Sequence, residues 1–264
     1  VVAAVRGRRA DTSALSAARV AEQGRGVVGA AALYALAALV GGAAFLYRVR
    51  RSGSTPRAAR SLLWLILGGF LGANLGGATT VISRLTGVAL PFALKDYSIL
   101  GGILGGAIAA ALLCRHYALP FWRTTDRGIP ALPLALSIGR LGCFVRGCCY
   151  GAPADSWLAL YLPDRAGVWL PRYPTQLLSA VANLAIFLVL VAVERYGHPR
   201  EGSVTLLFLA LFLIKRFGME FLRGDALPPV LGPLNSTHLM CVAGLGLVAV
   251  LWVRLRGKAR QGFA

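Results

Sequence analysis

A series of long apolar runs constrains this chain more than any other feature of its sequence. Seven runs can be read, at residues 27–47, 61–82, 97–114, 129–149, 174–193, 202–222 and 236–253. Each is close to the ~20 residues that an α-helix needs to cross the hydrocarbon core of a bilayer. Charged residues make up only 14% of the chain, against roughly 25% in an ordinary soluble domain. We therefore expect an all-α, polytopic membrane protein with about seven transmembrane helices.

The same pattern sets the domain organisation and excludes several classes of protein. We expect one transmembrane domain over residues 27–255, preceded by an uncertain N-terminal tail at 1–26 and followed by a basic cytoplasmic tail at 256–264. The formal net charge is +18, but the basic residues lie between the apolar runs and not on one polar surface. No nucleic-acid partner is therefore expected. Five cysteines, three of them in one short stretch, do not make a disulfide framework.

The basic residues of the loops predict the orientation of the chain in the membrane. Loops rich in Lys and Arg stay in the cytoplasm, so the richer set of loops should be cytoplasmic, with the C-terminus inside. The richer set holds Arg48, Arg50, Arg51, Arg57, Arg60, Arg115, Arg123, Arg127, Arg195, Arg200, Arg254, Arg256, Lys258 and Arg260. The opposite loops hold Arg84, Lys95, Arg165, Arg172 and Arg223. The arginines of residues 1–26 would then lie on the outer side, against this rule.

The longest outer loop, about residues 150–173, contains the large aromatic residues Trp157, Tyr161, Trp169 and Tyr173. Trp and Tyr are enriched where a protein meets the membrane–water interface. We expect this loop to form a small extracytoplasmic cap between helices four and five.

Charged residues inside two of the runs are the first candidates for chemistry. Arg140 lies near the middle of the fourth run, where a charged side chain costs at least ~2.5–3.5 kcal/mol to insert. Arg216 and Glu220 in the sixth run, and Arg223 just beyond it, are spaced to share one face of a helix. Arginines that converge in one cavity would bind phosphate, because the guanidinium fork is bidentate and always charged. The alternative is a structural ion network at the end of the helix.

Glycines form a second pattern, in the third run. Gly101, Gly102, Gly105 and Gly106 make two overlapping GxxxG pairs. Such pairs favour close packing between membrane helices. The functional alternative places the backbone of Gly101 and Gly102 beside a lipid headgroup.

Three cysteines form a third pattern, at the end of the fourth run. Cys143, Cys148 and Cys149 could supply three soft metal ligands. Because no fourth ligand has a recognisable spacing, we expect these thiols to pack and no metal to bind.

Four motifs, in order along the chain, resemble those of the prolipoprotein diacylglyceryl transferase family. Residues 139–151 read GRLGCFVRGCCYG and resemble the family signature, GR-x-G-[NC]-F with a closing YG or WG; Asp126 and Pro130 fit its D-x-x-x-P lead-in. Residues 173–177, YPTQL, resemble its HPSQL/YPTQL element, and residues 216–225, RFGMEFLRGD, resemble its RF-x-x-E-x-x-R-x-D element. The Gly-rich stretch 101–106 stands where the family carries HGG-x-x-G. The resemblance extends over about residues 96–240.

The resemblance implies a seven-helix enzyme of the bacterial inner membrane. Such an enzyme moves the diacylglyceryl group of phosphatidylglycerol onto the lipobox cysteine of a preprolipoprotein signal peptide and releases glycerol phosphate, with no cofactor or metal. The family's functional residues carry over to Arg140, Arg216 and Glu220 as catalytic residues. Taken with the predicted topology, which places an active site on the extracytoplasmic side, the candidate substrate-binding residues are Gly101, Gly102, Arg146, Gln176, Arg223 and His238.

Three positions depart from the family's pattern. Leu100 replaces the histidine of HGG, Phe212 replaces a tyrosine one turn before the sixth-helix arginine, and Cys148 replaces an acidic residue late in the signature. The alternative function is therefore a non-catalytic or altered-specificity phospholipid-binding membrane protein of the same fold.

The missing histidine bears on how the attacking thiolate would form. A free cysteine has a pKa of about 8.5, so a base or a strong positive field must help. His238 is one candidate base, since an ordinary histidine titrates near neutral pH. The other candidate is the combined field of Arg140, Arg216 and Arg223.

Overall fold

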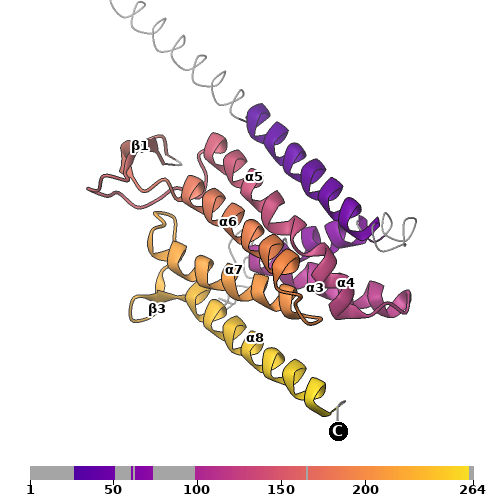
Figure 1. The fold of residues 1–264 in the computed structure, drawn as a ribbon. Coiled ribbons are helices and arrows are strands. Elements are labelled where there is room, and N and C mark those ends of the chain that lie inside the picture. The colour runs from indigo at the N-terminus through magenta and orange to yellow at the C-terminus, as the bar shows by residue number, and fades with distance from the viewer. Residues whose placement is uncertain (1–26, 51–60, 62, 74–98, 165, 262–264) are drawn as a thin grey trace, which may run out of the picture.

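The computed structural model describes residues 27–50, 61, 63–73, 99–164 and 166–261, and Figure 1 shows that most of this part is helical. The expected tail at 1–26 lies outside the described residues, as do residues 262–264 at the end of the expected C-terminal tail. The helices are Val27–Arg50, Leu63–Ala73, α3 (Ile99–His116), α4 (Phe121–Gly128), α5 (Ala131–Arg146), α6 (Thr175–Tyr196), α7 (Ser203–Phe221) and α8 (Ser236–Gln261). The expectation of an all-α protein is confirmed.

Several of these helices are suited to cross a membrane. Four stretches are long and apolar enough, namely Val27–Arg50, Phe121–Arg146, Thr175–Tyr196 and Ser236–Gly257. α7 has 19 residues but carries Lys215, Arg216 and Glu220. The helices Leu63–Ala73 and Leu100–His116 are apolar and shorter. The chain is thus a multi-pass membrane protein, and the count of about seven spans stays a prediction.

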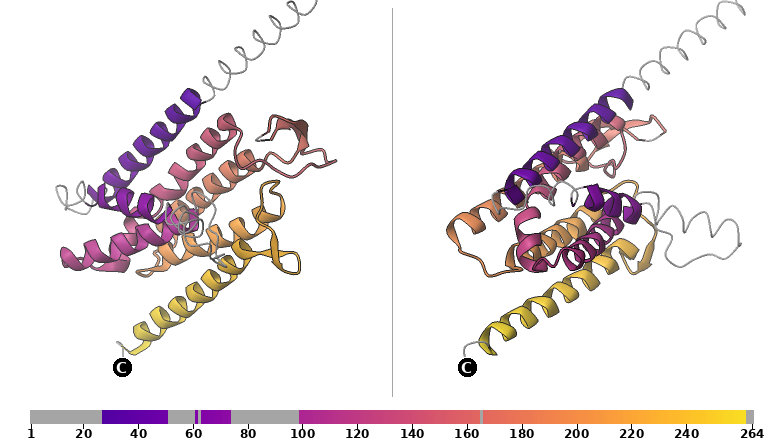
Figure 2. Two further views of the ribbon diagram at one scale, coloured as in Figure 1. Left: turned by 180° about the vertical axis from the view of Figure 1, so that it is seen from behind. Right: turned by 90° about the vertical axis from the view of Figure 1, so that its right-hand side faces the viewer.

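Helix Val27–Arg50 and the helices α5 to α8 lie side by side in that order (Figures 1 and 2). Val27–Arg50 and α5 approach closely through small residues. A Cβ added to Gly142 would lie 2.8 Å from the ring of Tyr34, and one added to Gly41 would lie 2.6 Å from the Cβ of Ala135. The earlier residue of the first helix contacts the later residue of α5, and the later residue contacts the earlier one. The two helices are therefore antiparallel.

α7 is the central helix of the apolar core. One face buries Phe208 and Phe212 against Leu190 of α6. Another face buries Leu213 against Cys241 of α8. These two packed faces place the charged C-terminal part of α7 between α6 and α8.

The start of α7 is held by a carboxylate from α4. Asp126 accepts hydrogen bonds from the backbone N–H groups of Gly202 at 2.5 Å and Thr205 at 2.8 Å, and from the Thr205 hydroxyl at 2.6 Å. Gly202, with φ of 87°, has no side chain to cap the helix itself. At the same end, Arg48 pairs with Glu194 at 2.5 Å. Asp126 of the lead-in motif therefore caps α7 from outside the helix.

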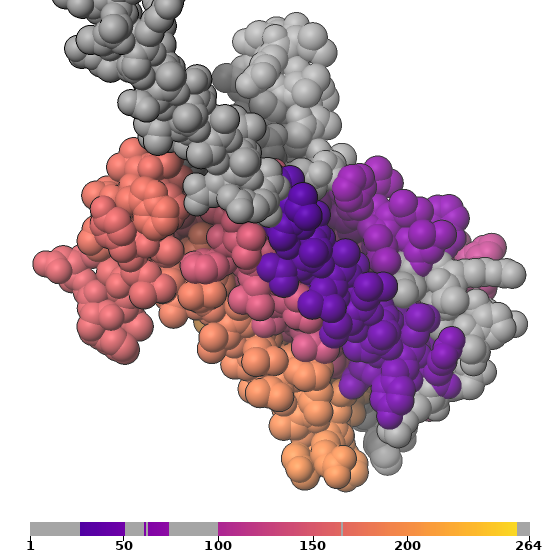
Figure 3. Space-filling view, turned by 90° about the horizontal axis from the view of Figure 1, so that it is seen from above, coloured from indigo at the N-terminus to yellow at the C-terminus, as the bar shows by residue number. Residues whose placement is uncertain are grey.

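The loop between α5 and α6 forms the small cap expected there. Strands β1 (Leu160–Pro163) and β2 (Trp169–Arg172) pair in antiparallel register. The rings of Tyr161 and Trp169 stack with centroids 5.8 Å apart, and Trp157 is 90% exposed. Figure 3 shows this region extending to one side of the helices. Its placement outside the cytoplasm stays a prediction.

Asp164 holds the turn of this hairpin. Its carboxylate accepts the backbone N–H groups of Ala166 and Val168, both at 2.9 Å, and pairs with Arg172 at 3.0 Å. The hydrogen bond from Val168, with help from Ala166 and Arg172, holds the pKa of this carboxyl below its ordinary value.

A second hairpin, between α7 and α8, was not predicted. It consists of β3 (Pro229–Leu231) and β4 (Leu234–Asn235). The strands have only three and two residues, and β3 begins with a proline, so they give no alternating pattern in the sequence. Asn235, at the end of β4, brings the first turn of α8 against the end of α7.

Candidate active site

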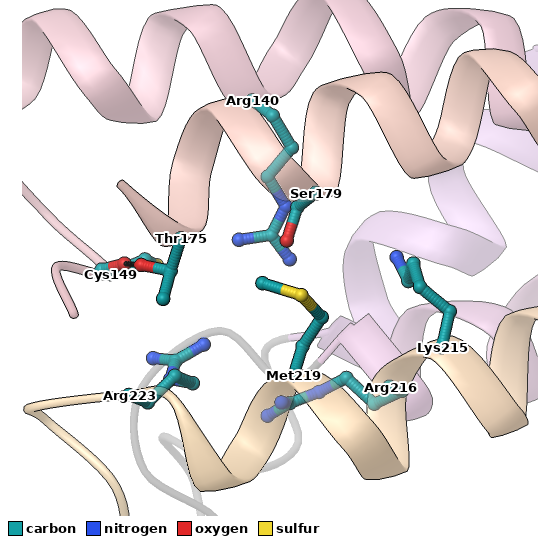
Figure 4. Close-up of a pocket in the computed structure, with 8 residues that line it drawn as sticks. All are labelled: Arg140, Cys149, Thr175, Ser179, Lys215, Arg216, Met219 and Arg223. Carbon is teal, nitrogen blue, oxygen red and sulfur yellow. Dashed lines mark hydrogen bonds between the residues drawn. The ribbon is translucent and has the colours of Figure 1, made fainter. Parts of the chain in front are cut away.

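A cavity lies between the C-terminal part of α5, the first turns of α6 and the C-terminal part of α7 (Figure 4). It is open to solvent, and the space free of protein atoms within it, open solvent included, is about 270 Å³. Its walls are formed by Arg140, Cys149, Thr175, Ser179, Lys215, Arg216, Met219 and Arg223. Four of these residues are cations and none is a carboxylate, so the cavity is suited to an anion. We call this cavity the arginine pocket.

Arg140 supplies the cation from α5. Its side chain reaches past Ser179 of α6 toward Met219 of α7 (Figure 4). The residue is half-buried, and within the described part of the chain its guanidinium makes no hydrogen bond or ion pair. Its donors are therefore available to two oxygens of one phosphate group.

Arg216 and Arg223 are oriented by a buried carboxylate behind the pocket. Glu220 is 3% exposed, and its Oε2 accepts a hydrogen bond from Nη1 of Arg216 and lies 3.9 Å from Nε of Arg223. Its Oε1 accepts a hydrogen bond from Nδ2 of Asn235 at 2.8 Å. Both oxygens are thus occupied, which makes Glu220 an anchor for the two arginines and for the start of α8.

Arg223 is also held by residues beside it and by the turn that follows α5. Its Nε and Nη2 each donate to a separate oxygen of Asp225 at 2.9 Å. Its backbone pairs with Gly151 in an isolated antiparallel bridge, and Gly224 N–H donates to the carbonyl of Tyr150 at 3.0 Å. A Cβ on Gly224 would lie 2.7 Å from the Gly151 carbonyl oxygen. The closing YG of the signature therefore joins the end of α7 to the turn that follows α5.

The polar face that α6 contributes to the pocket was not predicted from the sequence. Thr175, Ser179 and Asn183 recur every fourth residue, and all three are buried. Nζ of Lys215 donates to Oδ1 of Asn183 at 2.8 Å and lies 4.4 Å from the ring centre of Phe212. A polar stripe with helical spacing on an otherwise apolar helix was the available signal.

The end of the signature forms a tight turn beside the pocket. Gly147, with φ of 68°, ends α5, and Cys149 has φ of 59°. The carbonyl of Cys149 accepts the Thr175 hydroxyl at 2.7 Å, and the carbonyl of Cys148 accepts Nε2 of Gln176 at 3.0 Å. Gln176 therefore fixes the turn and does not line the pocket itself.

Three other predicted substrate-binding residues also lie away from the arginine pocket. Arg146 is exposed at the end of α5. Gly101 and Gly102 begin α3 and face helix Leu63–Ala73, where a Cβ on Gly102 would lie 3.3 Å from the carbonyl oxygen of Gly69. The geometry agrees with the packing interpretation of the GxxxG pairs.

His238, the candidate base, is buried at the start of α8. It is 2% exposed, and its ring lies 4.8 Å from that of Phe217 and 4.2 Å from that of Phe221. Its Nδ1 accepts the backbone N–H of Asn235 at 3.2 Å. Since His238 does not line the arginine pocket, its surroundings favour a structural part.

Two departures from the family's pattern are accommodated by the apolar core. Leu100 packs on the buried clusters that α7 forms with α6 and α8. Phe212 is 1% exposed, and its ring lies 5.7 Å from that of Phe208. Neither residue lines the arginine pocket.

Known proteins match this chain over a range that includes every residue of the arginine pocket. The model of the family described as prolipoprotein diacylglyceryl transferase matches residues 29–254. A relative from Gloeobacter violaceus, named phosphatidylglycerol–prolipoprotein diacylglyceryl transferase, is 32% identical over 211 residues, which are 76% of this chain and 78% of the relative. A relative of the same name from Trichormus variabilis is 28% identical over 86% of this chain and 85% of the relative. Another, from Symbiobacterium thermophilum, is 37% identical over 62% of this chain and 63% of the relative. The chain therefore belongs to the prolipoprotein diacylglyceryl transferase family.

Proposed function

We propose that this protein transfers the diacylglyceryl group of phosphatidylglycerol to the thiol of a lipobox cysteine in a preprolipoprotein signal peptide. The observation that carries the proposal is the arginine pocket, with four cationic side chains, no carboxylate in its wall and an unpaired Arg140 among the described residues. Phosphatidylglycerol presents one phosphate anion at the depth of a lipid headgroup. Family membership supports the same substrate pair.

The reaction needs charge stabilisation on the leaving group. The thiolate sulfur attacks the glyceryl carbon that carries the phosphate, so a carbon–sulfur bond forms and the carbon–oxygen bond to phosphate breaks. The electron pair of that bond leaves on glycerol phosphate, whose charge rises by one unit, and the thiol proton passes to the surrounding water. Arg140 of α5 and Arg223, just after the end of α7, line the pocket from opposite sides, where they bind the phosphate and stabilise the charge that develops on it.

Glu220 is proposed as a positioning residue. Its two oxygens are occupied by Arg216 and Asn235, so its charge fixes the direction of the guanidinium groups. Fixed cations in a site that excludes water stabilise a developing anion without having to reorganise. The field of these arginines also favours the thiolate of the acceptor, which offsets the loss of the family's histidine at Leu100.

The partners and location follow from the same proposal. The protein lies in the inner membrane of a bacterium, its C-terminus is cytoplasmic, and the arginine pocket faces the extracytoplasmic side. The bias of basic residues toward the opposite loops supports this orientation. The acceptor cysteine of an exported precursor would then arrive at the mouth of the pocket.

Complementation tests the function. A bacterial strain depleted of its own transferase should regain the gel shift of its lipoproteins when this chain is expressed. Purified protein should also attach the labelled diacylglyceryl group of phosphatidylglycerol to a lipobox peptide. Binding of phosphatidylglycerol with no transfer in either assay would instead support the phospholipid-binding alternative.

A further inference from the structure

Three thiols gather at the edge of the arginine pocket. The Sγ atoms of Cys143, Cys148 and Cys149 all lie within 4.8 Å of one another. The three residues are half-buried and their thiols are free. Cys149 belongs to the wall of the pocket. From the sequence we expect thiols that only pack, yet these three meet at one partly accessible place.

The backbone around the cysteines is wound so that they meet. Gly147 at φ of 68° turns the chain back over the end of α5, and Cys148 N–H then donates to the carbonyl of Cys143 at 3.2 Å. Cys149 has φ of 59°, a left-handed conformation that is uncommon for a residue with a side chain. Strained backbone of this kind persists where the surroundings enforce it. Here the Thr175 hydroxyl bonds the Cys149 carbonyl at 2.7 Å.

We propose that Cys143, Cys148 and Cys149 form a three-thiolate binding site for a soft metal ion of the Cu(I) type. Thiolates at about 2.3 Å from a central ion would stand about 4 Å apart in a trigonal plane, so small side-chain rotations suffice. Soft thiolate ligands select Cu(I) and Zn(II) over hard cations. Binding exchanges three thiol protons for one metal ion, with no change of oxidation state.

The number of ligands favours Cu(I) over Zn(II). Structural zinc takes four ligands, and no fourth His, Cys, Asp or Glu joins the group within the described part of the chain. The Tyr34 hydroxyl donates a hydrogen bond to Sγ of Cys143 at 3.5 Å. Three thiolates and one Cu(I) carry two negative charges, and Arg140 and Arg223 stand in the same pocket wall as Cys149.

An occupied site would compete with phosphate for these arginines. The anionic copper–thiolate group would lie at the pocket wall and offer Arg223 and Arg140 a fixed counter-charge. We therefore expect the metal to inhibit transfer, a consequence that rests on the proposed function. Binding itself does not rest on it, so the two can fail separately.

The test titrates purified, reduced full-length protein with Cu(I) under anaerobic conditions against a chromogenic Cu(I) chelator. One ion should bind per chain, with thiolate-to-copper absorption in the ultraviolet. Each of Cys143→Ser, Cys148→Ser and Cys149→Ser should weaken binding by more than about tenfold. The matched controls Cys114→Ser and Cys241→Ser, which remove buried thiols outside the group, should leave the affinity unchanged.

Several results would overturn the proposal. Unchanged affinity in any one of the three variants would remove that cysteine from the site. If Zn(II) binds more tightly than Cu(I), and Co(II) bound in its place gives the spectrum of a tetrahedral site, the assignment of a three-coordinate Cu(I) site is wrong. If a serine variant fails to fold, protection of the wild-type thiols from alkylation by one equivalent of Cu(I) supplies the same answer. Inhibition is then tested by measuring the transfer rate of each variant with Cu(I) and dividing it by the rate of the same variant without copper.

Discussion

Arg140 differs from the other two arginines of the pocket because no described residue pairs with it. Arg216 has Glu220, and Arg223 has Asp225 and Glu220. A cation without a protein partner is the one whose charge is free for a ligand. At the scale of single residues, the phosphate site therefore depends most on Arg140.

We expect Arg140→Ala to lower transfer by about a hundredfold or more, the usual cost of removing one preorganised donor. Arg140→Lys should also be poor, because a point charge does not reproduce the bidentate fork. The measurement is the rate of diacylglyceryl transfer to a lipobox peptide at saturating phosphatidylglycerol. Arg115→Ala, which removes an exposed arginine at the end of α3, should keep the wild-type rate. Near-normal transfer by Arg140→Ala would end the phosphate-site assignment.

The pair of Arg216 and Glu220 should couple strongly in stability. Their side chains are 12% and 2% exposed, and removing one partner of a buried ion pair costs about 3–5 kcal/mol. Glu220→Gln should therefore lower the free energy of unfolding by that order. Arg216→Gln with Glu220→Gln should cost clearly less than the two single changes added together. Unfolding of the detergent-solubilised protein by denaturant measures the cycle, and simple additivity would show that the pair is not coupled.

At the scale of elements, close packing between helix Leu63–Ala73 and α3 depends on particular glycines. A Cβ on Gly105 would lie 2.9 Å from Cα of Gly72, whereas a Cβ on Gly106 would meet nothing within 4 Å. Gly105→Ala should therefore lower the melting temperature by forcing the helices apart. Gly106→Ala is the matched control and should be neutral or slightly stabilising, since alanine favours helix over glycine. Equal melting temperatures for the two variants would contradict this packing.

The hairpin of β1 and β2 should loosen in acid. A carboxyl whose pKa is lower in the folded state stabilises the fold above its ordinary pKa, here 3.8, and loses this contribution as pH falls through the lowered pKa. The pKa of Asp164 is lowered in this way, chiefly by the Val168 N–H. Hydrogen exchange of the Ala166 and Val168 amides, corrected for intrinsic rates, should therefore speed up as pH falls from 3.8 through the lowered pKa of Asp164.

Two variants separate this cause from a general effect of acid. Asp164→Asn should show the faster exchange at all pH values and no further change in acid. Asp155→Asn, an exposed acid of the same loop, should behave like the wild type. Acid loosening that persists unchanged in Asp164→Asn would assign it to another group.

At the scale of the whole molecule, the sequence predicted the positions of the helices better than the contacts between them. Hydrophobic runs locate helices because every lipid-facing position must be apolar. The family signature located Arg140, and the motif at residues 216–225 located Arg216 and Arg223. The grouping of the three thiols depends on the positive φ of Cys149. The conformational preferences of cysteine do not predict such a φ. The burial of His238 depends on a hairpin, β3 with β4, that left no alternating pattern.

The orientation of the whole chain gives the last prediction. The arginine pocket lies where α5 ends and α6 begins, while Arg48 and Glu194 pair at the other end of α6. The loop at 197–202, beside that pair, belongs to the set of loops rich in basic residues, so it should stay in the cytoplasm. A fluorescent reporter inserted at 199 or fused after 264 should fold and fluoresce, since such reporters mature inside the cell. An alkaline phosphatase inserted at 155, in the cap, should be active only if the cap is exported. The opposite pattern would place the arginine pocket on the cytoplasmic side, where an exported lipobox cysteine could not reach it, and the proposed acceptor would have to be abandoned.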